Sequence, residues 1–115
     1  MKVKASLPDS LSRRYKRLRQ SLARLGYISQ GSVLDRSTLT PPRSGYQWTR
    51  KVAQKTITVS LSEAQYRGLK EAVANQRTLR KIIVEMEKIS RQILFAKLPD
   101  THRRERLNKK VLGLV

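Results

Sequence analysis

Two aromatic side chains and three cations gather in one short segment near the middle of this 115-residue sequence. Tyr46, Trp48 and Arg50 lie two residues apart, so an extended chain places all three on one side, and Lys51 and Lys55 follow. Aromatic faces stack on exposed bases while cations hold a phosphate backbone, which makes this segment a candidate nucleic-acid contact. The alternative is that Trp48, the single Trp of the chain, anchors a core between sheet and helix.

A second set of candidate binding residues lies near the N-terminus. Between residues 10 and 25, apolar side chains recur every three or four residues, which predicts an amphipathic helix. Its other face holds cations with no acid among them, so these cations cannot form salt bridges along that face. We expect this helix to track phosphates; a solvated basic face and a membrane-surface helix are the alternatives. The cations are Arg13, Arg14, Lys16, Arg17, Arg19 and Arg24.

Further cations lie outside these two segments. Arg43 belongs to a proline-containing loop before the aromatic segment, and the C-terminal stretch is basic after Leu98-Pro99. Two interpretations of that stretch stay open, a short helix over Thr101–Leu112 or a basic tail. The C-terminal candidates for phosphate contact are Arg103, Arg104, Lys109 and Lys110.

The balance of charge favours a polyanionic partner. Lys and Arg number 26 against 8 Asp and Glu, a formal net charge of +18, and such self-repulsion disfavours the compact state unless an anion neutralises it. Nucleic acid and acidic membrane are the polymeric anions of a cell, and phosphate neutralisation releases counterions, so nucleic acid is the expected partner.

Several classes of chemistry are disfavoured. Without Cys the chain has no disulfide, thiolate metal site or Cys nucleophile, and its one His, His102, lies in a basic run. We find no Gly-rich phosphate loop, no signal peptide and no apolar run of about 18 residues. We therefore expect a non-enzyme without cofactor or metal that does not bind membrane and is cytoplasmic, with nucleoid association as an alternative.

The elements that position these residues follow from the periodicity. Pro8, Asp9 and Ser10 supply start signals for the first helix, and Gly26 is expected to end it in the left-handed conformation. The period then changes to two, which predicts three antiparallel strands, with Ala53-Gln54 as a tight hairpin turn. The expected strands are 31–36, 46–51 and 55–61.

The longest predicted element is a helix over 63–97. Ser62 and Gln65 form a capping-box pattern at its start, and its length would be about 52 Å at 1.5 Å per residue. Because the small sheet is too short to cover its distal half, 79–93, three covers are open: the first helix, a second copy or another protein. We favour the first helix, and in that case expect Ile83 to be buried.

The middle of the chain also resembles a known family. Gly45-Tyr-Gln-Trp-Thr-Arg-Lys-Val52, Lys55-Thr-Ile-Thr58 and Leu61-Ser-Glu-Ala-Gln65 are similar to a family of small bacterial proteins whose genes often lie beside transposase genes. The family has no established activity, so the resemblance, over about 18–90, implies a fold pattern and a mobile-element context. Most members carry a Cys-rich loop before the hairpin; here 37–44 has no Cys, so no zinc site follows and other contacts must hold the loop.

Together these observations predict an α+β fold: a basic N-terminal helix, a small antiparallel sheet, a long helix and a basic tail. We expect one domain over 1–115 whose ends, 1–9 and 98–115, are flexible or become ordered on nucleic acid. The expected function is a non-enzymatic, mainly phosphate-binding accessory subunit of a ribonucleoprotein or mobile-element complex, with RNA favoured over DNA. A larger protein such as a transposase, nuclease or reverse transcriptase is a candidate partner. The alternatives are a DNA-binding transposition accessory protein and a helix-mediated protein adaptor.

Overall fold

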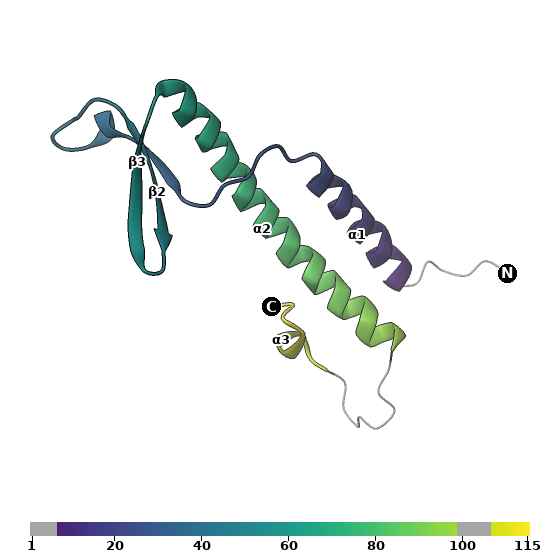
Figure 1. The fold of residues 1–115 in the computed structure, drawn as a ribbon. Helices are drawn as coiled ribbons and strands as arrows, with labels where there is room; N and C mark the ends of the chain where they lie inside the picture. Colours follow the sequence, from purple (N-terminus) through teal and green to yellow (C-terminus); the bar gives the residue numbers. More distant parts are fainter. Residues whose placement is uncertain (1–6, 99–106) are drawn as a thin grey trace. The chain divides into compact units, whose positions relative to one another are not determined.

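The fold is that of a computed structural model, which describes residues 7–98 and 107–115 (Figure 1). Its elements confirm the expected α+β class, with an N-terminal helix, a three-stranded antiparallel sheet and a long helix. In chain order they are α1 (Leu7–Ala23), β1 (Ser32–Asp35), the 3-10 turn η1 (Arg36–Thr38), β2 (Tyr46–Val52), β3 (Lys55–Leu61), α2 (Glu63–Lys97) and α3 (Lys109–Leu112).

The chain divides into two compact units. One unit is Leu25–Leu79, which holds the sheet and the first half of α2. The other joins the chain up to Arg24 to Arg80–Val115, and so holds α1, the second half of α2 and α3. We call them the sheet unit and the helical unit.

In the helical unit, α1 and the second half of α2 run side by side in opposite directions (Figure 1). Arg14 of α1 forms an ion pair with Glu85 of α2 at 3.2 Å. The apolar seam is narrow: Ile89 is 1% exposed and Leu11 is 9% exposed. The first helix therefore lies along the distal half of α2, the neighbour favoured from the sequence, but it buries only part of the apolar side there.

Two expectations for this helix pair are wrong. Ile83 is 41% exposed, because the shared seam centres on Ile89 rather than on the stripe that contains Ile83. Gly26 does not adopt the left-handed conformation, and α1 ends at Ala23. The last turn instead closes by the hydrogen bond from the Arg24 N–H to the Ser21 carbonyl, at 3.2 Å, so a glycine cap is not needed.

In the sheet unit the strands have the order β1-β2-β3, and each neighbouring pair is antiparallel. Trp48 in the central strand pairs with Val33 on one side and Val59 on the other. Because paired residues share a face, Trp48 lies in an apolar row that crosses the sheet. Val59 nevertheless remains 41% exposed.

The turn between β2 and β3 is Ala53-Gln54, as expected, and both residues have positive φ values, 50° and 67°. Two consecutive left-handed residues form the type of turn that matches the twist of a two-residue hairpin. It fixes the register that starts at the pair Val52–Lys55.

The start of α2 confirms the capping box. The Ser62 hydroxyl accepts from the Gln65 N–H at 3.1 Å, and the Gln65 side chain accepts from the Ser62 N–H at 2.9 Å. Two N–H groups at the helix start are thereby satisfied. From Glu63 the helix continues without a break for 35 residues to Lys97.

The segment between α1 and β1 is tied to the first half of α2. The Ser29 N–H donates to the Ala72 carbonyl at 3.1 Å, and the Asn75 amide donates to the Tyr27 carbonyl at 2.9 Å. Ala72 and neighbouring Val73 are buried in the sheet unit, at 6% and 5% exposure. The backbone of 27–29 is therefore fixed on the helix.

Candidate nucleic-acid interface

The outer face of α1 carries a row of exposed arginines. Arg13 and Arg17 lie four residues apart on the side of α1 opposite the apolar stripe. Arg24, expected within the helix, lies in the turn that directly follows its last residue, Ala23. All three side chains are exposed, and none forms an ion pair with a residue in the described ranges. We call these three residues the α1 arginine row.

A groove runs along the flank of α1. Its volume is about 590 Å³, and it is lined by Lys16, Arg19 and Tyr15 of α1 together with Ile93 of α2. Both cations are exposed, and Tyr15 is half-buried. The groove therefore combines an aromatic ring with two positive charges.

Arg14 differs from the other cations of α1, because its guanidinium donates to Glu85 at 3.2 Å. Lys88 also contacts the same carboxylate, at 3.5 Å. Arg14 keeps 54% of its side chain exposed, so its ion pair is largely solvated and contributes little to stability. Arg14 therefore connects α1 to α2 and also remains a positive charge on the surface.

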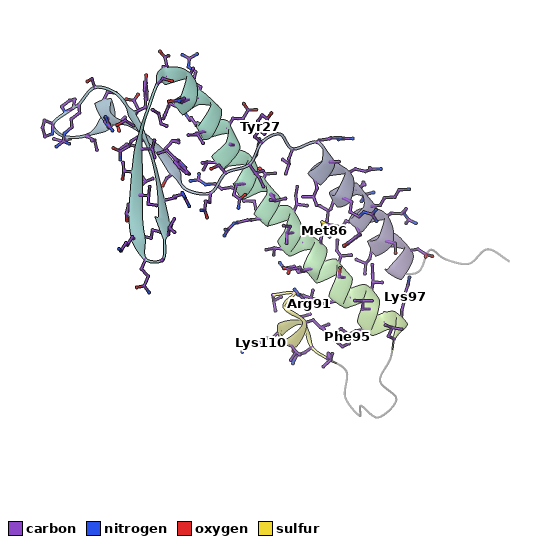
Figure 2. All side chains as sticks on the ribbon, in the orientation of Figure 1. Tyr27, Met86, Arg91, Phe95, Lys97 and Lys110 are labelled. Atoms are coloured by element: carbon purple, nitrogen blue, oxygen red, sulfur yellow. The ribbon has the colours of Figure 1, made fainter. Side chains whose placement is uncertain are left out.

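The second half of α2 supplies cations that sequence reasoning did not single out. Arg80 and Lys81 are exposed and line a groove of about 490 Å³ with Val84 and Glu85. Arg91 donates to the Leu112 carbonyl and so ties the C-terminal segment to α2 (Figure 2). The sequence did contain an indication of Arg80 and Lys81, because both lie in a stretch of α2 with few acidic residues.

The predicted C-terminal cations fall into two groups. Lys109 and Lys110 are exposed on α3, whose first turn is capped by Asn108 through the Val111 N–H at 2.8 Å. Arg103 and Arg104 lie outside the described residues. Against all these cations, the acids in the described part of the helical unit are Asp9, Glu85 and Glu87.

The aromatic segment of β2 does not present both rings to solvent. The ring of Tyr46 stacks on that of Tyr66 in α2, with centroids 4.5 Å apart and an interplanar angle of 26°. Lys70 lies 5.7 Å from the centroid of the Tyr66 ring. One face of Tyr46 is therefore occupied within the protein, and Tyr46 works as a contact between sheet and helix.

Trp48 is half-buried and held by two partners. Its indole N–H donates to the Gln30 carbonyl at 3.0 Å, and the guanidinium of Arg50 lies 5.5 Å from the ring centroid. The Arg50 Nε is buried without a hydrogen-bond partner. These contacts favour the structural role that we weighed for Trp48, and they place Arg50 against the ring.

The hairpin divides its other cations between two faces. By the register, Lys55 shares the face of Trp48 and Arg50, while Lys51 lies on the opposite face with Thr49 and Thr58. Both lysines are exposed. The hairpin thus offers positive charge on either side.

The loop between β1 and β2 contains no cysteine and is held by polar contacts. Arg36 donates to the Gln47 side chain at 3.2 Å and to the Ser60 hydroxyl at 2.9 Å, and its carbonyl accepts from the Arg43 N–H at 3.0 Å. Asp35 accepts from the Ser37 hydroxyl and N–H, and these two hydrogen bonds lower the pKa of its carboxyl. Arg43 itself is exposed at the loop.

Tyr27 is a further surface residue that sequence reasoning missed. Its side chain is 92% exposed although its carbonyl is fixed by Asn75 (Figure 2). No periodic pattern marks it, because it lies in the irregular segment between α1 and β1.

In the described ranges no three His, Asp or Glu side chains lie close enough to hold a metal ion. None of the helices there is long and apolar enough to cross a membrane. No family model, curated protein or solved structure matches this chain.

Proposed function

We propose that this protein binds nucleic acid mainly through phosphates, as a non-enzymatic accessory subunit of a ribonucleoprotein or mobile-element complex. The observation that carries the proposal is the α1 arginine row, two exposed arginines on the outer face of α1 and a third directly after its end, none of which forms an ion pair within the described ranges. Arginine suits phosphate because its planar fork donates two parallel hydrogen bonds.

The helical unit supports this proposal beyond a single helix. Lys16 and Arg19 line the α1 groove, and exposed cations also lie on the second half of α2 and on α3. A ligand that touches several of these elements neutralises more charge than one lying on a single face. A folded RNA suits this distribution better than a straight duplex, and none of the described elements forms a helix-turn-helix that would enter a major groove.

The experiment is a titration of labelled nucleic acid by fluorescence anisotropy at several salt concentrations. We expect stem-loop RNA to bind more tightly than duplex DNA of equal length. The logarithm of affinity should fall steeply and linearly with the logarithm of salt between about 50 and 200 mM. Tighter binding of duplex DNA would favour a transposition accessory protein, and absence of binding at low salt would overturn the proposal.

A second candidate is the helix-mediated adaptor, favoured by apolar residues that α1 leaves uncovered. Leu94 and Leu98, at the end of the long helix, are 53% and 69% exposed. An apolar interface of this kind responds little to salt. A partner whose binding survives high salt, and is lost in Leu94→Asp, would identify this role.

A further inference from the structure

In the part of the chain that the structure describes, the outer edge of β3 has no strand beside it. In the order β1-β2-β3 this strand lies at the end of the sheet, and every residue from Lys55 to Ser60 is exposed. Ile57 and Val59 are 38% and 41% exposed on the face that also carries Trp48. An exposed strand of this length with apolar side chains is a ready template for pairing.

The hairpin register shows which backbone groups are available at that edge. Pairs along an antiparallel ladder alternate between hydrogen-bonded and non-hydrogen-bonded types, and the pair that closes a two-residue turn, here Val52–Lys55, is hydrogen-bonded. The N–H and C=O groups of Thr56, Thr58 and Ser60 consequently point away from β2. They form a regular row of donors and acceptors.

Few of the usual devices protect this edge. Natural edge strands are shortened or carry charges, proline or bulges, whereas β3 has seven residues and a single charge, Lys55, at its start. At the opposite edge, β1 has only four residues and ends at Asp35, whose carboxylate is engaged by Ser37. Of the two edges, β3 is the one suited to pairing.

We propose that β3 pairs antiparallel with β3 of a second copy of this chain, about a two-fold axis at Thr58. The sequence around Thr58 is self-complementary in this register. Thr58 faces the partner's Thr58, Ile57 faces the partner's Val59, and Thr56 faces the partner's Ser60. Thr56, Thr58 and Ser60, whose N–H and C=O groups point away from β2, are then each opposite one of the same three residues in the partner. Their backbone groups can therefore all form hydrogen bonds across the joined edge.

The side chains match on both faces of the joined sheet. On one face the row Val33–Trp48–Val59 continues into the partner's Ile57, which covers apolar surface that is now exposed. On the other face, Thr and Ser lie opposite one another, pairs that favour cross-strand contact. Because the same edge is used by both copies, the assembly closes as a dimer rather than growing into a filament.

Salt separates this dimer from nucleic-acid binding. Two chains of formal charge +18 repel each other, and salt screens that repulsion. Dimerisation therefore strengthens as salt rises, whereas phosphate binding weakens. The dimer does not depend on the proposed function, and either can fail alone.

The decisive experiment uses the absence of native cysteine. In nuclease-treated protein at high salt, mild oxidation of Thr58→Cys should give a disulfide-linked dimer, since facing residues of a hydrogen-bonded pair have Cα atoms about 5.5 Å apart. Thr56→Cys is the matched control: in this register the two copies of residue 56 lie about 14 Å apart along the strands, too far for a disulfide. Equal cross-linking of both variants, or of neither, overturns the proposal.

Analytical ultracentrifugation of the unmodified chain measures its oligomeric state independently of cross-linking. We expect a concentration-dependent dimer that becomes more populated with salt, and a monomer for Thr58→Pro. Proline there removes an N–H that β2 does not use, so circular dichroism should show an intact fold. A monomeric wild-type chain at all concentrations, or a Thr58→Pro variant that still dimerises, contradicts pairing through β3.

Discussion

Arg14 of the first helix and Glu85 of the long helix are joined by an ion pair of 3.2 Å, although 71 residues separate them in sequence. The pair marks the place where α1 lies against the second half of α2. Because Arg14 is committed to this contact, the cations best placed to meet an external phosphate are those of the α1 arginine row.

The first prediction concerns that row. Changing Arg13, Arg17 and Arg24 together to Gln should weaken RNA binding and reduce the magnitude of the salt slope by about two to three, because each lost phosphate contact removes roughly one released counterion. Gln has a helix propensity close to that of Arg, so the helix should persist. Anisotropy titrations over a salt series measure both quantities.

A matched control for this prediction is Arg67→Gln. Arg67 is exposed, but its charge is already met by Glu63 at 2.6 Å, so its loss should leave affinity nearly unchanged. If Arg67→Gln weakens binding as much as Arg17→Gln does, charge in general rather than the α1 arginine row determines affinity.

The second prediction compares two isoleucines on the long helix. Ile89→Asp should unfold the helical unit, because Ile89 is 1% exposed and a carboxylate there would be buried without a partner. Ile83→Asp should be tolerated, with a loss of less than about 1 kcal/mol, because Ile83 is 41% exposed. Thermal melts followed by circular dichroism test both; similar melts for the two variants would contradict the position of the seam.

The third prediction concerns Trp48. Trp48→Phe keeps an aromatic ring but loses the indole hydrogen bond to Gln30, so we expect a loss of about 1 kcal/mol in stability. Trp48→Ala should lose about 3 kcal/mol, near the lower end for removal of a large aromatic, because the side chain is only half-buried. Urea titrations give these values, and RNA affinity measured under folding conditions should change little in the Phe variant.

The fourth prediction uses two glycines. Gly31→Ala should be strongly destabilising, because φ is +103° and a Cβ would lie 2.5 Å from the Thr49 carbonyl oxygen and 2.6 Å from the Trp48 Nε1. Gly68→Ala should instead stabilise by about 0.5–1 kcal/mol, since that glycine lies inside α2 with open space around it. The melting temperature should fall for Gly31→Ala and rise for Gly68→Ala. A shift of the same sign for both variants would contradict the different environments of the two glycines.

The elements were predictable wherever local signals agreed. The strand alternation, the turn at Ala53-Gln54 and the reciprocal bonds of Ser62 and Gln65 all depend on residues close in sequence. The favoured neighbour of the distal half of the long helix was also correct, since α1 lies along it, although Ile83 there stays exposed.

What the sequence could not supply was the relation between distant residues. The stack of Tyr46 on Tyr66 and the ion pair of Arg14 with Glu85 depend on tertiary placement, and each changes the meaning of a predicted binding residue. Ile83 and Ile89 both lie on the apolar side of α2, and the narrow seam with α1, rather than the pattern, decides which is buried. The expectations about RNA, partners and the family resemblance stay predictions.

The hairpin turn leaves room for engineering. Ala53 and Gln54 both hold left-handed backbone conformations that disfavour residues with a Cβ by about 1–2 kcal/mol each. Asn-Gly is the pair that such turns prefer. Replacing Ala53-Gln54 by Asn-Gly should therefore stabilise the hairpin without changing a side chain on either face of the sheet. Destabilising substitutions on the strands could then be studied in a protein that still folds.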